Sequence, residues 1–271
     1  MARRRIGLVG VGATWLGDGM ETTTSADGTA IAFEQVGEGP PVVIVGGAFS
    51  KASDGGALAA ALVDVGFRAV TLDRRGRGES GDKRGSTPED EADDLAAVID
   101  AIGGDAIVLG HSSGAMLALY AASRGVPIRA LFLSEPPFRF GVGEPDPMLT
   151  ERLQHLVDGG RSDEAVTTFQ LEAVELPRDL VDMIRGSDMF PGLVAVAQST
   201  VYDARLSAQV STPTPEMLAV SQPVTVLRGE ETVPNFLIPA ECLAGGEGCA
   251  ATVFGAQSGM RPSLSHISQP P

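Results

Sequence analysis

Apolar and polar positions along the chain predict strands that alternate with helices. Residues 42–45 and 106–109 are short, wholly apolar runs, as expected for strands buried on both faces of a parallel sheet. Between them, residues 88–102 repeat apolar side chains at helical spacing after Thr87 and Pro88, which together form a strong helix start. The expected strands are residues 29–36, 41–45, 67–72, 106–109, 127–134 and 223–227, with 250–254 as a weaker last strand. This alternation predicts an α/β fold with a mainly parallel, doubly wound sheet.

Residues 138–222 interrupt the alternation. Their pattern is helical and lacks strong strands. The helices expected there are residues 147–158, 163–174, 178–185 and 192–206. We therefore expect a helical cap, residues 138–222, inserted into a core made of residues 22–137 and 223–271. Residues 1–21 are interpreted as a disordered extension.

One stretch joins a predicted strand to a predicted helix through serines. Residues 106–109 lead into Gly110-His111-Ser112-Ser113-Gly114, and small and apolar residues follow. The G-x-S-x-G pattern between a strand and a helix predicts a sharp turn with Ser112 at its apex. Because Gly110 and Gly114 have no Cβ, strand and helix can approach closely there. The helix N-terminus would offer backbone N–H groups to a developing negative charge on oxygen.

The charge and the cysteine content indicate which kinds of partner the protein is expected to bind. The chain has 35 acidic and 20 basic residues, a formal net charge of −15, which disfavours nucleic acid and anionic membranes as partners. The acidic side chains of residues 89–100 are expected to form a solvated helix face. Cys242 and Cys249 lack metal-ligand spacing, and no apolar run is long enough to cross a bilayer. We expect a cytoplasmic protein without metal or cofactor that binds a small molecule; a homo-oligomer is compatible with the sequence.

Taken in order, residues 22–231 resemble the α/β-hydrolase superfamily. The resemblance rests on Gly46-Gly47-Ala48-Phe49 after a buried strand, on Asp73-Arg74-Arg75-Gly76-Arg77-Gly78-Glu79-Ser80, on the turn around Ser112, and on the helical insertion before residues 223–227. It implies Ser112 as nucleophile, followed along the chain by an acid and then a histidine. It also implies an oxyanion hole made by the backbone N–H groups of Ala48 and Ser113. Many relatives carry His-Gly where this chain has Gly46-Gly47.

The acid and the histidine of such a triad have several candidates. Glu135 ends the strand after the nucleophile strand, and Glu231 ends the next one; we favour Glu135 because a strand end and two prolines fix it. His111 is expected to point away from Ser112, and His155 lies in the cap. His266 is therefore the expected base, as the histidine in the required chain order. It comes later than in the family pattern, which suggests a frameshifted or truncated C-terminal segment.

The resemblance implies a serine hydrolase that acts on a small ester-like or ketone substrate through an acyl-enzyme. One alternative is a carbon–carbon bond hydrolase that uses the same triad. Another is a catalytically inactive homologue that binds a small molecule or only folds. The position of His266 relative to Ser112 distinguishes the active from the inactive protein.

Overall fold

An eight-stranded sheet forms the centre of the protein in the computed structural model, which describes residues 19–229 and 249–254. The strand order is β1-β2-β4-β3-β5-β6-β7-β8. The strands are β1 (Glu21–Thr24), β2 (Ala30–Val36), β3 (Pro41–Val45), β4 (Arg68–Leu72), β5 (Ala106–His111), β6 (Ile128–Ser134), β7 (Val224–Gly229) and β8 (Cys249–Phe254). β1 pairs with β2, and β2 with β4, in antiparallel fashion; all other pairs are parallel. The predicted α/β fold with a mainly parallel sheet is confirmed.

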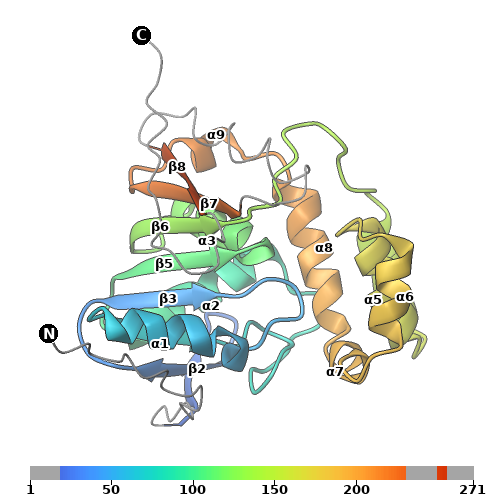
Figure 1. Ribbon diagram of the computed structural model, residues 1–271, viewed down its shortest axis with the longest axis horizontal. Coiled ribbons are helices and arrows are strands. Elements are labelled where there is room, and N and C mark those ends of the chain that lie inside the picture. The colour runs from blue at the N-terminus through green and yellow to red at the C-terminus, as the bar shows by residue number, and fades with distance from the viewer. Residues whose placement is uncertain (1–18, 230–248, 255–271) are drawn as a thin grey trace, which may run out of the picture.

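Helices cover both faces of this sheet, with α1 in front of it and α2 and α3 behind it (Figure 1). The helices are η1 (Ala52–Gly55, a 3₁₀ turn), α1 (Gly56–Asp64), α2 (Pro88–Ala101), α3 (Ser113–Ser123), α4 (Leu149–Asp158), α5 (Ser162–Glu172), α6 (Arg178–Arg185), α7 (Phe190–Ala195), α8 (Gln198–Val210) and α9 (Pro215–Leu218). None of the helices in the described ranges is both long and apolar enough to span a membrane.

The structure differs from the expected elements at three places, one of which is the short helix α9 in a segment where no helix was expected. The edge strand β1 was not expected, because its four residues are polar or charged and show no apolar alternation. The single helix expected over residues 192–206 is two helices, α7 and α8. Val196 caps the first of them with φ −109° and ψ 22°, which are not helical values.

Six helices, α4 to α9, lie between β6 and β7 in the chain, and we call the first five of them, α4 to α8, the insertion. Within it, α8 stands between the sheet and the outer helices α5 and α6 (Figure 1). Helix α8 contacts α4 and α5 of the insertion, and it also contacts α2 and α3 of the core. Helix α8 is therefore the main link between the insertion and the core.

Helix α3 anchors the turn that precedes it. Met116, Leu117 and Leu119 are almost completely buried in the main hydrophobic cluster, together with side chains of α2, β5 and β6. Burial of each such side chain contributes about 1.5–3 kcal/mol. A helix that is apolar on all sides is expected in the interior, and this burial fixes where the chain turns from β5 into α3.

The acidic residues of α2 do not form the solvated face that we expected. Glu91 and Asp94 are each only 2% exposed, and they pair with Arg74 and Arg75. The expectation was wrong because the loop after β4 carries buried arginines that require carboxylate partners. Of the six acidic residues in this helix, only Asp100 is exposed.

Candidate active site

Ser112 occupies the turn between β5 and α3 in a backbone conformation that side-chain-bearing residues rarely adopt. Its φ is 53° and its ψ is −125°. The flanking glycines make the turn sterically feasible. A Cβ on Gly110 would lie 2.5 Å from the carbonyl oxygen of Gly114, and one on Gly114 would lie 2.3 Å from the carbonyl oxygen of Val45. The strained conformation projects Ser112 at the carboxyl end of the sheet.

Backbone hydrogen bonds hold this turn in place. The N–H of Ser112 donates to the carbonyl of Ser134 over 2.9 Å, which ties the turn to the end of β6. The N–H of Ala115 donates to the carbonyl of Ser112, also over 2.9 Å. The strain at Ser112 is thus maintained by its neighbours on both sides.

The loop after β3 passes directly beside Ser112. A Cβ on Gly47 would lie 3.0 Å from the Cβ of Ser112, so only glycine fits there without movement. The next residue, Ala48, lines the same cavity as Ser112 and Ser113. Ser113 is the first residue of α3, and the N–H groups of a first helical turn have no partner within the helix. The two residues expected to form an oxyanion hole therefore border the space in front of Ser112.

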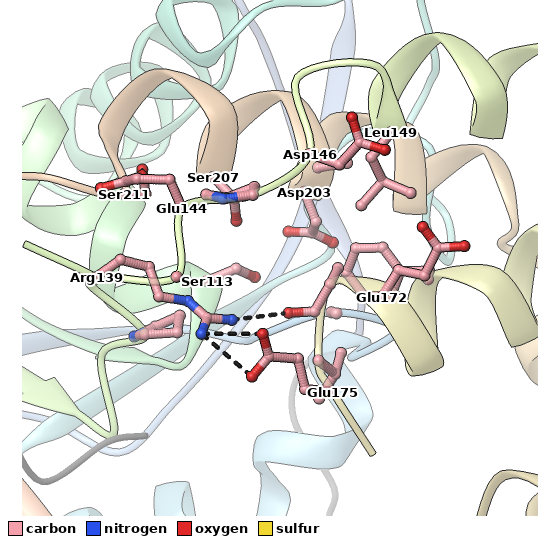
Figure 2. A pocket seen from close by; sticks show the side chains of 18 of the residues that line it. Ser113, Arg139, Glu144, Asp146, Leu149, Glu172, Glu175, Asp203, Ser207 and Ser211 are labelled. Atoms are coloured by element: carbon pink, nitrogen blue, oxygen red, sulfur yellow. Dashed lines mark hydrogen bonds and ion pairs between the residues drawn. The ribbon is translucent and has the colours of Figure 1, made fainter. Parts of the chain in front are cut away.

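A cavity of about 100 Å³ opens in front of these residues, between the core and the insertion. Leu149, Phe169 and Ala204 give it an apolar wall. The ring of Phe169 packs edge-to-face on Phe49, with centroids 5.6 Å apart. Ser113 from the core and Asp203 from α8 border the same space (Figure 2).

Ion pairs connect the segments around the cavity. Arg139, after β6, reaches Glu175 in the connection between α5 and α6 over 3.2 Å (Figure 2). Arg152 of α4 pairs with Asp146 and with Glu172. These pairs link the loop after β6 to helices α4 and α5 on the cavity rim.

Four buried charged side chains form one cluster at the cavity, which Asp203 lines, and their charges balance. Arg74 donates to both carboxylate oxygens of Glu91 over 2.9 Å, and to Asp203 over 2.9 Å. Arg77 donates to the other oxygen of Asp203 over 2.5 Å. Burial raises the pKa of Asp203, but the charges of Arg74 and Arg77 outweigh it, so this pKa lies below its ordinary value. We call Arg74, Arg77, Glu91 and Asp203 the buried quartet.

The buried quartet was not predicted from the sequence. The one available signal was the presence of three arginines in the loop from Asp73 to Ser80, next to a buried strand. Nothing in the sequence singles out Asp203 as their partner, because it lies in an otherwise ordinary amphipathic helix far along the chain. In the described ranges, no group of three or more histidine, cysteine, aspartate or glutamate side chains could hold a metal ion.

Glu135 lies at the end of β6, next to the end of β7. Its φ is 50°, its N–H donates to the carbonyl of Leu227 over 2.9 Å, and its Oε1 accepts from the N–H of Gly229 over 2.6 Å. Desolvation lowers the pKa of His111, and the nearby Glu135 carboxylate acts in the opposite direction. The Glu135 carboxylate is therefore held close to the turn that carries Ser112.

His111 and His155, which were not expected to be the base, lie on β5 and α4. His111 makes a 3.3 Å contact from Nδ1 to the hydroxyl of Ser134. His155 is exposed on α4. Glu231 and His266 fall outside the described residues. The structure thus brings together Ala48, Ser112 and Ser113, with Glu135 fixed at the neighbouring strand end.

Comparison with known proteins identifies the family. Residues 31–256 match the model of the alpha/beta hydrolase family. An alpha/beta hydrolase from Sphaerobacter thermophilus is 40% identical, with a TM-score of 0.82 over 89% of this chain and 95% of that one. A non-heme haloperoxidase from Rhodococcus erythropolis is 27% identical over 266 residues, covering 91% of this chain and 93% of that protein. A thermophilic esterase from Thermogutta terrifontis shares the fold at 24% identity, with a TM-score of 0.64 over 88% and 90% of the two chains. In agreement with the resemblance seen in the sequence, the chain belongs to the alpha/beta hydrolase family.

Proposed function

We propose that the protein is a serine hydrolase that cleaves a small ester-like substrate through an acyl-enzyme on Ser112. The observation that carries the proposal is the strained Ser112 turn facing a cavity, with Ala48 and Ser113 beside it. The Ser112 hydroxyl attacks the carbonyl carbon, and a histidine takes its proton. That proton passes to the departing alcohol. Water then attacks the acyl-enzyme and releases the acid.

Backbone N–H groups stabilise the tetrahedral intermediate in this proposal. The donors are those of Ala48, in the loop pressed against Ser112, and Ser113, at the start of α3. Donors held in place before the reaction stabilise the oxyanion without having to reorganise. The burial of α3 and the close contact at Gly47 supply that rigidity.

Glu135 is the proposed acid, and His266 the proposed base. A triad carboxylate holds its histidine in the correct tautomer and stabilises the charged imidazolium. Glu135 suits this role because Gly229 and Leu227 fix it beside the nucleophile turn. Glu231 remains the alternative acid from the chain order.

The cavity favours a small substrate with an apolar part. Its volume of about 100 Å³ and the wall formed by Leu149, Phe169 and Ala204 suit a short acyl or alkyl group. The esterase name of the Thermogutta terrifontis structure supports the same reaction class. A carbon–carbon bond hydrolase would use the same groups, and assays with matched ester and diketone substrates distinguish the two.

Labelling with a fluorophosphonate, read out by intact mass, tests the proposal. Wild type should gain one adduct, and Ser112→Ala should gain none. Ser207→Ala is the matched control, because this serine also lines the cavity but lies on α8; it should label like wild type. Removal of a triad partner in His266→Ala or Glu135→Gln should slow labelling by about 10²-fold or more.

Two results would overturn the proposal. Labelling that persists in Ser112→Ala would place the nucleophile elsewhere. A wild-type protein that folds but does not label would support the catalytically inactive homologue instead. If Ser112→Ala does not label but His266→Ala labels at the wild-type rate, the nucleophile stands and the assignment of His266 as base fails.

A further inference from the structure

One nitrogen of Arg74 touches three segments that meet at the proposed oxyanion hole. Its Nη1 lies 3.1 Å from the hydroxyl of Ser113, 3.4 Å from the carbonyl oxygen of Gly46 and 2.9 Å from Asp203. Ser113 would supply one oxyanion donor, and Gly46 begins the loop that carries the other, Ala48. The third contact, Asp203, belongs to the insertion.

The remaining nitrogens of Arg74 keep its guanidinium from rotating. Nε and Nη2 donate to the two oxygens of Glu91 in a paired arrangement. Such a bidentate contact fixes the plane of a guanidinium as well as its position. Burial alone would lower the pKa of Arg74, but Asp203 and Glu91 raise it above its ordinary range, so the group stays charged. Arg74 is therefore a rigid, permanently charged donor behind the site.

The loop and the helix that Arg74 joins are also packed tightly against each other. A Cβ on Gly114 would lie 2.5 Å from the carbonyl oxygen of Gly46. The distance between the two oxyanion donors thus depends on contacts between the Gly46 carbonyl, α3 and Arg74. A shift at any one of them would move one donor relative to the other.

We propose that Arg74 is a positioning residue for the oxyanion hole, and that Asp203 couples the insertion to it. This inference rests on the proposed function. Arg74 does not touch the substrate; it holds the Gly46 carbonyl and the Ser113 hydroxyl so that the N–H groups of Ala48 and Ser113 converge. The insertion, which forms the other wall of the cavity, contributes to the same arrangement through Asp203.

The neighbouring Arg75 provides a matched control. It is fully buried, like Arg74, and it pairs through two nitrogens with Asp94 over 2.6 Å. It also binds Asp27 and Ser86, but none of its hydrogen bonds in the described residues reaches Gly46 or Ser113. Replacing either arginine by lysine removes a buried bidentate pair, yet only one replacement disturbs the proposed oxyanion hole.

The test compares Arg74→Lys and Arg75→Lys in hydrolysis of p-nitrophenyl acetate and in inhibition by benzeneboronic acid. The boronic acid forms a tetrahedral adduct with a serine nucleophile and so reports on the oxyanion hole. Arg74→Lys should lower kcat by about 10- to 100-fold with little change in KM, because displacing a catalytic group by about 1 Å can cost 10²-fold. Its affinity for the boronic acid should fall by a similar factor. Arg75→Lys should keep both values within about twofold of wild type.

A second variant covers the case in which Arg74→Lys does not fold. Ser113→Ala keeps the backbone N–H but removes the hydroxyl that accepts from Arg74, so it should lower kcat and boronic acid affinity in the same direction. Where both variants fold, their effects should be less than additive, because they break the same contact.

Equal loss of activity in Arg74→Lys and Arg75→Lys would overturn the inference, since buried charge alone would then explain it. An unchanged boronic acid affinity in both Arg74→Lys and Ser113→Ala would also overturn it. In either case the proposed function survives if wild type labels at Ser112. Absence of wild-type labelling and hydrolysis removes both proposals.

Discussion

Replacing Asp203 by asparagine should destabilise the protein strongly, because it breaks an ion pair that water cannot replace. Asp203 is fully buried and accepts from Arg74 over 2.9 Å and from Arg77 over 2.5 Å. The variant leaves two buried guanidiniums facing the single carboxylate of Glu91. Burial and the charge of Arg74 already lower the pKa of Arg77, which shows the repulsion between the two arginines.

The expected cost follows from this geometry. Removing one partner of a buried ion pair costs about 3–5 kcal/mol of unfolding free energy. For a chain of this size, each kcal/mol shifts the Tm by about 2–4 °C, which gives a decrease of about 6–20 °C. Urea denaturation followed by circular dichroism measures the free energy directly.

An exposed ion pair supplies the control. Arg129 and Asp105 pair across the surface, with each side chain 53% exposed. Asp105→Asn should therefore cost less than about 1 kcal/mol. If Asp203→Asn costs no more than Asp105→Asn, water screens the buried quartet as it does a surface pair, and the reasoning fails.

The pH dependence provides a further check on the same variant. Because the pKa of Asp203 lies below its ordinary value in the folded protein, its ionised form contributes stability above the unfolded pKa of about 3.9. That contribution disappears as the pH falls through the lower folded value. The difference in stability between wild type and Asp203→Asn should therefore shrink in acid, and a constant difference would contradict the assignment.

Two further predictions concern other parts of the fold. Gly114→Ala should lower the free energy of unfolding by about 1–3 kcal/mol or more, because the new Cβ would lie 2.3 Å from a backbone oxygen. Gly192→Ala is the control: a Cβ there has nothing within 4 Å, so this variant should stabilise α7 by about 0.5–1 kcal/mol. Thermal unfolding of the two variants measures the difference. Desolvation raises the pKa of Glu89, but hydrogen bonds from Tyr120 and Gln209 outweigh it and lower the value from 4.5 to about 2. The carboxylate therefore contributes stability above pH 4.5 that is lost as the pH falls through 2. The Tm of Glu89→Gln should vary less across this window than that of wild type, and parallel profiles would refute the assignment.

Features set by local sterics could be predicted from the sequence. The turn at Ser112 follows from an apolar strand, two glycines and a helix-forming run that are adjacent in the chain. Glu135 was located by the same kind of signal, a strand end followed by prolines. In both cases neighbouring residues determine the backbone path, so the pattern is visible without knowledge of the fold.

Features set by long-range pairing could not be predicted. Asp203 meets Arg74 and Arg77 only because α8 docks against α3, and no periodicity in either segment specifies that contact. The acidic residues of α2 were assigned to solvent because charged side chains are usually exposed. That rule failed for Glu91 and Asp94, since their arginine partners lie in a separate loop.

The ion pairs of the loop from Asp73 to Ser80 oppose movement of α8 away from the core. The arginines of this loop bind Asp27 in the turn before β2, Glu91 and Asp94 in α2, and Asp203 in α8. Moving α8 away from the core would therefore expose unpaired charge in the middle of the molecule. Hydrogen exchange of amides in α8 should accordingly be as slow as in β5, with both regions exchanging through the same cooperative unfolding event. The insertion and the sheet would then form one foldon, in which the insertion cannot open as an independent unit.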